Sequence, residues 1–335
     1  MAEVKRKRTI VIAEAGVNHN ADLELAREMV VAAKEAGADY VKFQTAVPEL
    51  VISSIAPKAE YQKAETGEEE SQLEMCRKLH FPIEHYAGLK EYCREVGIGF
   101  LSTPFDMVSL RYLIELGMDY LKIPSGEITN LPFLREAARG GMPVILSTGM
   151  SEMSEVEAAV DVLKPHTEVI VLQCNTQYPT PFQDVNLLAM PAMGKKLGLP
   201  YGYSDHTPGI EAAIGAVALG ASVIEKHFTL SRSLPGPDQK ASLEPAELAA
   251  MVRAIRNVEA ALGSAEKTVS PSERANIEVA RKSIVAARDI KKGERLTYEN
   301  LTVKRPGNGI SSWKIDEIVG MTAIKDFPYD SLIET

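Results

Sequence analysis

Residues 201–229, YGYSDHTPGIEAAIGAVALGASVIEKHFT, contain the pattern that decides the fold. The periodicity predicts a short strand at Tyr201–Tyr203, an alanine-rich helix, and a second strand at Val223–Lys226 that ends on His227. A strand, a helix and a strand in this order form two parallel strands of one sheet, whose carboxyl ends open onto the same face. We therefore expect an α/β protein whose polar strand ends meet at one edge.

Polar side chains follow both of these strands. Asp205 and His206 lie in the turn after the first strand, and His227 ends the second. Because side chains alternate along a strand, Glu225 and His227 should point to one side and Lys226 to the other. Neutral imidazole is a common metal ligand, and a nearby carboxylate can orient the ring or a metal-bound water. The pattern predicts a metal site, with ordinary polar roles as the alternative, because neither an HExxH nor a CxxC motif strengthens it.

Strand and helix patterns also alternate along the rest of the first 262 residues. The other strands are predicted at Thr9–Ala13, Tyr40–Phe43, Gly99–Ser102, Tyr120–Ile123, Val144–Ser147 and Glu168–Leu172. A long helix at Glu244–Leu262 completes about eight strand–helix pairs, the number found in a (β/α)8 TIM barrel. A doubly wound open sheet would be expected to carry a glycine-rich first turn, and AEAGVNHN at residues 13–20 is not GxGxxG. The barrel is therefore favoured.

Three segments depart from this alternation. Residues 48–82 carry many charges and predict an insertion over one face, with a short helix. Residues 263–275 lack an apolar period and predict a linker. Residues 276–335 contain short β-branched runs broken by KKGE and PGNG turns, which predict a compact β-rich module. We expect a catalytic barrel at 1–262, the linker, and a small second domain at 276–335.

Two lysines lie inside otherwise apolar strand sequences, Lys42 in VKFQT and Lys122 in LKIPS. Burying an ammonium group without an anion is costly, so each needs a partner. One explanation is a structural ion pair with a carboxylate such as Glu127. The other is a small bound polyanion, because hydroxyl groups that can join the lysines in binding phosphate or carboxylate follow nearby strands. The polar residues at the predicted strand ends are Glu14, Asn18, His19, Gln44, Thr45, Ser102, Thr103, Asp106, Ser125, Glu127, Ser147, Thr148, Asn175, Gln177 and Tyr178.

Composition excludes several classes of protein. The chain has 335 residues, 45% of them hydrophobic, and a formal net charge of -9, which argues against a nucleic-acid or anionic-membrane surface. Three widely spaced cysteines, Cys76, Cys93 and Cys174, give no disulfide framework and are typical of a reducing cytoplasm. No apolar run reaches the roughly 18 residues that a membrane span requires, so we expect no membrane partner.

A dozen motifs, in order, carry a resemblance to a known family. They are IAEAGVNHN, VKFQT, APKAEYQ, STPFD, KIPSGE, ILSTGM, YPTPF, GYSDHT, IEKHFT, GPDQKAS, ARKSIVA and KRPGNGI. Together they closely resemble the sialic acid synthase family, which makes nonulosonic acids such as N-acetylneuraminate. The match runs nearly end to end, and the C-terminal part is similar to the antifreeze-like (SAF) domain.

The resemblance implies a transferase that condenses phosphoenolpyruvate with N-acetylmannosamine and releases phosphate by C–O cleavage. A legionaminate synthase that uses a 2,4-diacetamido hexose is the alternative within the family. The resemblance also implies a divalent metal, manganese before magnesium or cobalt. It further implies a domain-swapped homodimer in which the SAF domain of one subunit covers the barrel mouth of the other.

Site residues follow from the matching motifs. The resemblance assigns His206 and His227 as metal ligands, Glu225 near a metal-bound water, and Glu14 to proton transfer. It assigns Lys42, Thr103, Lys122, Ser125 and Ser147 to phosphoenolpyruvate, and Gln44, Tyr178, Asp238 and, from the partner subunit, Arg305 to the sugar. Gln239 stands where the family often has His, and Thr176 with Asn175 before it departs from some relatives. The roles of these three positions stay open.

Two classes outside the family also remain. A catalytically silent scaffold is disfavoured by two strand lysines and paired histidines, and metal analysis would identify it. An unrelated barrel aldolase would form a Schiff base on Lys42 or Lys122, which borohydride would trap in the presence of pyruvate.

Overall fold

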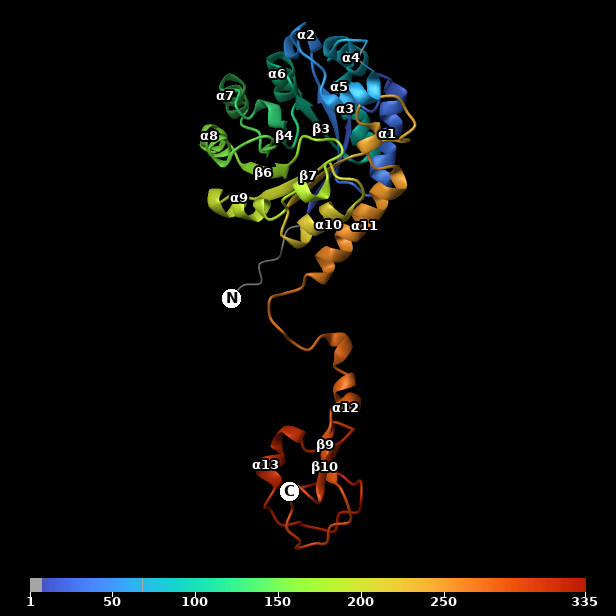
Figure 1. The fold of residues 1–335 in the computed structure, drawn as a ribbon, viewed down its shortest axis with the longest axis vertical. Coiled ribbons are helices and arrows are strands. Elements are labelled where there is room, and N and C mark those ends of the chain that lie inside the picture. The colour runs from blue at the N-terminus through green and yellow to red at the C-terminus, as the bar shows by residue number, and fades with distance from the viewer. Residues whose placement is uncertain (1–7, 68) are drawn as a thin grey trace. The chain divides into compact units, whose positions relative to one another are not determined.

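The computed structural model of the protein describes residues 8–67 and 69–335. The chain divides into two compact units, Met1–Gly263 and Ser264–Thr335 (Figure 1). Among the described residues, no helix is both long and apolar enough to cross a membrane.

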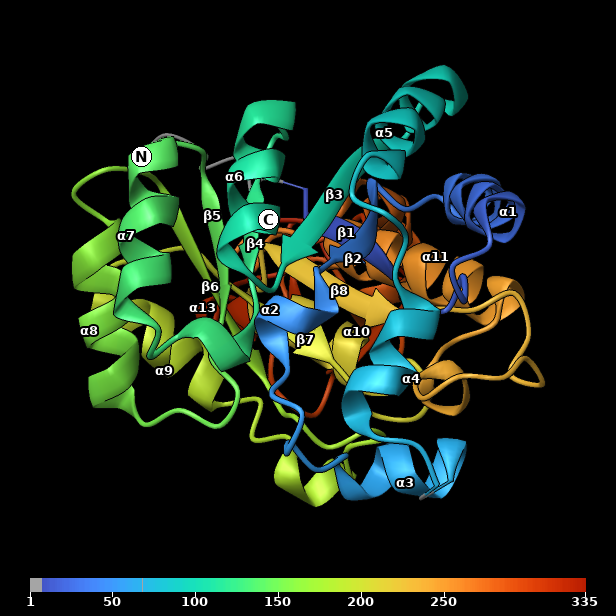
Figure 2. The ribbon, with the colours of Figure 1, turned by 90° about the horizontal axis from the view of Figure 1, so that it is seen from above.

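The first unit is built on one sheet of eight parallel strands in the order β3-β2-β1-β8-β7-β6-β5-β4. The strands are β1 (Ile10–Gly16), β2 (Tyr40–Thr45), β3 (Gly99–Pro104), β4 (Leu121–Ile123), β5 (Val144–Ser147), β6 (Val169–Cys174), β7 (Tyr201–Asp205) and β8 (Val223–His227). β1 pairs with β8, and β3 and β4, the two ends of the order, lie next to each other, so the sheet forms a nearly closed barrel (Figure 2). The predicted TIM-barrel fold is confirmed.

A helical layer surrounds the sheet (Figure 2). Its main helices are α1 (Leu23–Glu35), α5 (His85–Val96), α6 (Met107–Leu116), α7 (Leu131–Gly140), α8 (Met153–Leu163), α9 (Ala189–Leu197), α10 (Glu211–Ala218) and α11 (Pro245–Ala261). Sequence signals locate their ends: Asp22 accepts from the first amides of α1, and Gly97 ends α5 with a left-handed φ of 79°. The helices pack on outward-facing strand residues such as Val41, Phe43 and Ile224.

The interior of the barrel has an apolar floor and a polar layer above it. The floor consists of Ile12, Leu101, Ile145, Leu172 and Val223, all fully buried. Side chains alternate along a strand, so the residues two positions further on in these strands also point inward, one step nearer the carboxyl ends. They are Glu14, Thr103, Ser147, Cys174 and Glu225. The alternation of side chains along the strands therefore places a ring of polar groups at the barrel mouth. β1 runs to Gly16 rather than ending at Ala13, which keeps Glu14 inside the strand.

The insertion between β2 and α5 contains three helices, where the sequence predicted one short helix. They are α2 (Pro48–Val51), α3 (Glu60–Thr66) and α4 (Gln72–Leu79). Ser71 and Glu74 form a capping box that starts α4. The buried Lys58 Nζ donates to Thr66 Oγ1 at 3.0 Å and to the carbonyl oxygen of Gly67 at 3.1 Å. Local caps and side-chain contacts therefore help to order this insertion.

The second unit holds a small antiparallel sheet of β9 (Ser283–Ala286) and β10 (Leu301–Lys304). Two short helices, α12 (Asn276–Ala280) and α13 (Ile315–Ile318), belong to the same unit. Its core consists of Ile284, Ala286, Ile290, Leu296, Leu301, Ile318, Ala323, Phe327 and Ile333. The β-rich character was predicted, but much of the unit is held by isolated bridges rather than by long strands.

Candidate active site

The polar layer of the barrel lines a cavity of about 160 Å³, which we term the inner cavity. It is lined by Glu14, Lys42, Gln44, Thr103, Phe105, Lys122, Pro124, Ser125, Gly126, Ser147, Met150, Cys174, Thr176, Tyr178, Ser204, His206, Glu225 and His227. All the residues that the resemblance assigned to phosphoenolpyruvate, to proton transfer and to the metal are in this set. Residues up to about two hundred positions apart meet because every strand of a parallel barrel ends at the same mouth.

Lys42 lies at the centre of a buried charge network. Its Nζ is 2.7 Å from Glu14 Oε2, 2.7 Å from Thr103 Oγ1 and 3.6 Å from Glu225 Oε2. Gln44 Nε2 donates to the other oxygen of Glu14 at 3.1 Å. Lys42 is therefore held in place by groups of three strands before any ligand enters.

Lys122 is held less tightly. Its Nζ donates to Ser147 Oγ at 2.7 Å and lies 3.7 Å from Glu225 Oε1. Glu127, the example that the sequence gave of an ion-pair partner, instead accepts from Asn130 Nδ2 at 2.6 Å. The ion-pair alternative holds with other carboxylates, and the one shared by both lysines is Glu225.

The pKa values of the two carboxyl groups of the network are shifted in opposite directions. Burial raises the pKa of Glu225, but the nearby Lys122 and Lys42 more than offset this and hold the pKa below its ordinary value. Burial also raises the pKa of Glu14, and the negative charge of Glu225 adds to the rise despite the contact with Lys42. Two groups whose environments separate their pKa values are typical of acid–base sites. Glu225 is the fixed anion, and Glu14 is the group that exchanges a proton more easily near neutral pH.

The two histidines stand side by side at the mouth. The ring centroids of His206 and His227 are 5.4 Å apart, and Tyr178 stacks on His206 with centroids 4.1 Å apart. His206 Nδ1 is hydrogen-bonded to the carbonyl oxygen of Asn175. Burial lowers the pKa of His206 to about 4 and also lowers that of His227. Both rings are therefore neutral at pH 7.

These two rings suit a divalent ion. Because His206 Nδ1 donates to the carbonyl oxygen of Asn175, the free lone pair of this ring lies on Nε2. In His227, Nδ1 is buried without a hydrogen-bond partner among the described residues. In residues 8–67 and 69–335, no group of three or more His, Cys, Asp or Glu side chains is arranged to hold a metal. The chain therefore offers two imidazoles, one fewer than the three protein ligands that are typical of a catalytic zinc site.

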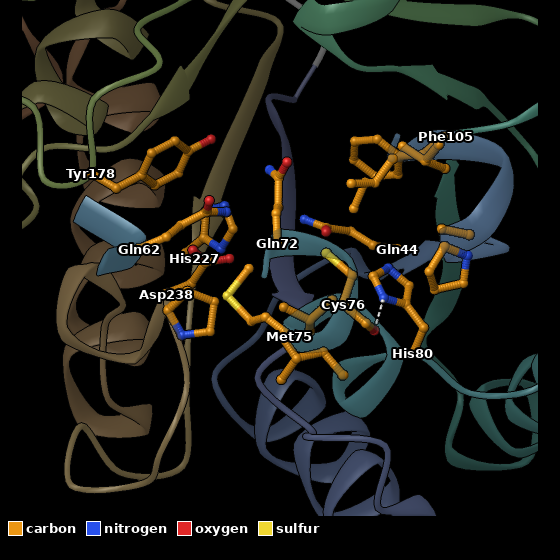
Figure 3. Close-up of a pocket in the computed structure, with 17 residues that line it drawn as sticks. Gln44, Gln62, Gln72, Met75, Cys76, His80, Phe105, Tyr178, His227 and Asp238 are labelled. Atoms are coloured by element: carbon orange, nitrogen blue, oxygen red, sulfur yellow. Dashed lines mark hydrogen bonds between the residues drawn. The ribbon is translucent and has the colours of Figure 1, made fainter. Parts of the chain in front are cut away.

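A second cavity of about 250 Å³, the outer cavity, adjoins the inner one (Figure 3). Gln44, Phe105, Tyr178 and His227 line both. The other residues of the outer cavity are Val17, Ala46, Pro48, Val51, Ile52, Gln62, Gln72, Met75, Cys76, Leu79, His80, Pro237 and Asp238. Amide and apolar side chains predominate here, in contrast to the charges of the inner cavity.

Much of the outer cavity comes from the insertion, and sequence reasoning missed these residues. Gln72, Met75, Cys76 and Leu79 follow the i, i+3, i+4, i+7 spacing of one face of α4, and this face lines the cavity (Figure 3). That spacing was visible in the sequence. It did not reveal which surface α4 covers, because that depends on where the insertion folds back.

The structure also places the positions whose roles were open. Thr176 lines the inner cavity, and Asn175 binds His206 through its carbonyl oxygen. Gln239 is buried, donates from Nε2 to the carbonyl oxygen of Asn18 at 3.0 Å and accepts from Thr229, so it fastens the loop after β8. Asp238 lines the outer cavity, and burial raises its pKa to about 6.

Some predicted strand-end residues line neither cavity. His19 is fully buried and stacks on Phe81 with centroids 4.1 Å apart, and Asn18 Nδ2 donates to the carbonyl oxygen of Phe228. Asp106 caps α6 through the amide of Ser109. These are packing and capping roles, and strand-end position alone did not distinguish them from site residues.

Arg305 lies in the second unit. Its side chain is exposed, its Nε donates to the carbonyl oxygen of Ala280 at 3.2 Å, and the bond to Pro306 is cis. Within the described part of unit Ser264–Thr335, Arg305 is the sole residue that the sequence assigned to the substrate.

Comparison with known proteins gives a consistent result. The model of the NeuB family matches residues 29–267, and that of the SAF domain matches residues 281–335. An N,N'-diacetyllegionaminic acid synthase from Campylobacter jejuni subsp. jejuni serotype O:2 is 48% identical over 98% of this chain and 99% of its own. One from Legionella pneumophila subsp. pneumophila is 47% identical over 92% of this chain and 89% of its own.

A solved structure is similar as well. The crystal structure of an N-acetylneuraminic acid (sialic acid) synthetase from Leptospira borgpetersenii serovar Hardjo-bovis, in complex with citrate, has a TM-score of 0.71. It is 37% identical, and the match covers 82% of this chain and 91% of that one.

Proposed function

This chain belongs to the NeuB family and carries an SAF domain, and from this premise we propose that it joins phosphoenolpyruvate to a diacetylated hexosamine to make a legionaminic acid. The observation that carries the reaction is the inner cavity, where two lysines, two neutral imidazoles and a carboxyl group with a raised pKa meet. A scaffold protein would have no need to bury this set, because buried charges cost stability unless they are used or paired.

The acceptor is the point at which sequence and comparison differ. The family resemblance put N-acetylmannosamine first and the 2,4-diacetamido hexose second, although the motifs fit both. The comparisons favour the opposite order. Two relatives named as N,N'-diacetyllegionaminic acid synthases are 48% and 47% identical to this chain, whereas the sialic acid synthetase is 37% identical. The outer cavity suits an acetamido group of either sugar, since Gln62 and Gln72 can hydrogen-bond an amide while Val51, Ile52 and Met75 offer apolar surface to its methyl group.

Phosphoenolpyruvate would bind in the inner cavity. Lys122 is the main anion-binding group, because its strongest contact is the neutral hydroxyl of Ser147 and Glu225 is farther away. Lys42 adds a second positive charge, and Thr103, Ser125 and Ser147 offer hydroxyl groups. Charge-assisted hydrogen bonds in a buried site would orient the anion with little reorganisation.

Glu14 would move the proton. Attack of C3 of phosphoenolpyruvate on the aldehyde carbon leaves negative charge on the aldehyde oxygen, and the carboxyl group of Glu14 would donate its proton there. Water then adds at C2, phosphate leaves with cleavage of its C–O bond, and Glu14 takes up the proton that the water releases. The raised pKa of Glu14 suits both steps, because general acid–base catalysis is most effective near the working pH.

His206 and His227 would hold the divalent ion, manganese first. When bound, such an ion supplies Lewis-acid stabilisation of charge on the aldehyde oxygen. Tyr178 and Asn175 would fix the His206 ring, and Glu225 is engaged by both lysines and by Ser204, whose Oγ donates to it at 3.0 Å. Glu225 would therefore act mainly by holding both lysines in place.

The deciding experiment measures phosphate release from phosphoenolpyruvate with the 2,4-diacetamido hexose and with N-acetylmannosamine, each with and without Mn²⁺. We expect release with both, a higher kcat/KM for the diacetamido sugar, and loss of activity with a chelator. His227→Ala should remove Mn²⁺ binding and activity together. A higher kcat/KM for N-acetylmannosamine would replace the proposed acceptor by the second candidate, an N-acetylneuraminate synthase. Absence of release with any acylated hexosamine would refute the reaction.

Two expectations from the resemblance stay predictions. The homodimer can be measured by light scattering, and the contact between Arg305 and the acyl group of the sugar predicts a raised acceptor KM in Arg305→Ala. The cytoplasmic location, which was expected from the three cysteines, also stays a prediction.

A further inference from the structure

Asp205 and Lys226 form an ion pair that belongs to neither cavity. Lys226 Nζ is 2.9 Å from Asp205 Oδ2, and both side chains have 0% exposure. They point to the helix side of the barrel, as alternation predicts, because Ser204 and Glu225 beside them point inward. Tyr203 and Ile224, two positions earlier on the same face, belong to the apolar core.

Stability alone does not account for this pair. Moving two charges out of water costs several kcal/mol for each ion, and an apolar pair of similar volume is often as stable or more stable. The neighbouring residues on this face of β7 and β8 are apolar, so an apolar pair would suit the layer. A fully buried ion pair differs from an apolar contact chiefly because it fixes the distance between the two side chains and their relative orientation.

The hydrogen bonds of the pair lie on both sides of His206, and Lys226 directly precedes His227. Asp205 and Lys226 are the last partners of the β7–β8 ladder, and each is followed directly in sequence by a histidine, His206 or His227. Lys226 Nζ also donates to the carbonyl oxygen of Thr207 at 2.6 Å. Asp205 Oδ1 accepts from Thr207 N at 2.9 Å and from Thr207 Oγ1 at 2.7 Å. The backbone on both sides of His206 is thus tied to β8 beyond the point where the ladder ends.

We propose that Asp205 and Lys226 are positioning residues, which set the separation and orientation of the His206 and His227 rings so that the pair can bind a divalent ion. The inference rests on the metal site of the proposed function. Neither residue lines either cavity, so their effect reaches the ion through the backbone of the histidines. Groups that orient metal ligands from behind typically change metal affinity by about 10- to 100-fold when they are removed.

The test is a double variant of the full chain, Asp205→Asn with Lys226→Met. It removes both charges at once, so no lone charge stays buried, and Asn keeps an oxygen that can accept from Thr207. The electron paramagnetic resonance signal of free Mn²⁺ reports the Kd, and thermal unfolding without metal reports stability. We expect the Kd to rise about 10- to 100-fold with a nearly unchanged melting temperature. An unchanged Kd in the folded variant would overturn the proposal.

A matched control is Asp39→Asn with Arg256→Met. This pair, with Arg256 Nη2 2.8 Å from Asp39 Oδ2, lies near the amino ends of the strands, and Asn can still accept from Val11 N. We expect the same Kd as in the wild type, and an equal rise would also overturn the proposal. Should the first double variant not fold, Thr207→Val removes a single hydrogen bond of the pair and should raise the Kd by a smaller factor; an unchanged Kd there counts against the proposal.

A readout without metal separates this inference from the metal assignment. In ¹⁵N-histidine NMR spectra of the metal-free protein, the ring signals of His206 and His227 should shift or broaden in Asp205→Asn with Lys226→Met and not in the control. If the wild type binds no Mn²⁺, the metal assignment fails and these spectra decide the positioning role. Identical ring signals in the variant and the wild type would refute it.

Discussion

The inner and outer cavities share four residues but are built from different kinds of structure. The inner cavity consists mainly of strand side chains whose backbones are held by hydrogen bonds to neighbouring strands. The outer cavity depends on α2, α3 and α4, which are ordered by caps and by contacts such as those of Lys58. The inner cavity holds several charged groups, whereas Asp238 is the one carboxyl group among the residues that line the outer cavity.

This difference teaches which cavity sets which property. Charged groups on rigid strands are preorganised, and in the proposed reaction they would bind phosphoenolpyruvate, which is the same substrate whichever sugar is the acceptor. Neutral groups on an insertion can differ without disturbing the barrel, and in the proposed reaction they would contact the part of the acceptor that distinguishes one sugar from another. Changes in the inner cavity should therefore lower the rate with every acceptor, and changes in the outer cavity should alter the ranking of acceptors.

The largest effect is expected in the inner cavity for Lys122→Met. Methionine keeps the length of the side chain, but the variant loses the ammonium group that we propose binds the anion and leaves Glu225 to Lys42 alone. Removing one partner of a buried charge pair costs about 2–5 kcal/mol, so kcat/KM for phosphoenolpyruvate should fall on the order of 10²- to 10³-fold. Steady-state phosphate release with each of the two sugars measures it.

The control for this variant is Lys196→Met, which removes a surface ion pair with Glu157 and should leave the kinetics unchanged. A similar fall with both sugars would sharpen the contrast between the cavities. A fall with one sugar alone would break it, because the inner cavity would then be selecting the acceptor.

The next effect concerns the charge of the outer cavity. Burial raises the pKa of Asp238 from 3.8 to about 6, so the folded protein holds this proton more tightly than the unfolded chain does. The stability that the protonated group contributes is complete below about pH 4 and is lost as the pH rises through 6. Asp238→Asn should therefore match the wild type at pH 4 and be more stable at pH 8, by at most about 3 kcal/mol.

Urea unfolding across this pH range measures the effect, with the exposed Asp161→Asn as the control. Parallel pH curves for Asp238→Asn and the wild type would show that the Asp238 carboxyl group is not desolvated. If the two pH curves diverge and the acceptor KM is raised in Asp238→Asn, the outer cavity keeps the Asp238 carboxyl group for binding at a cost in stability.

The smallest effect is expected for Gln72→Ala on α4. One hydrogen bond to a neutral group is worth about 0.5–1.5 kcal/mol, so the KM of the diacetamido sugar should rise roughly 2- to 10-fold with little change for phosphoenolpyruvate. Lys78→Ala, an exposed position of the same helix, is the control. An equal rise in KM for N-acetylmannosamine would mean that Gln72 does not separate the two acceptors.

The sequence predicted the inner cavity well and the outer cavity poorly, for a physical reason. Alternation along strands and the common direction of parallel strands locate Glu14, Lys42, Lys122 and Glu225 without knowledge of any contact. The insertion has no such rule, because the contacts of Gln62 or Met75 depend on where the segment folds back.

Several side-chain contacts became known only from the tertiary structure. The sequence by itself determined the barrel, the second domain and the side of the sheet to which each strand residue points, because these follow from local periodicity. Tertiary contacts decided that Glu225 rather than Glu127 faces the lysines, that Gln239 fastens a loop, and that Asp205 pairs with Lys226 behind the histidines. Each of these choices joins residues distant in sequence, and such pairs are defined only once the barrel closes.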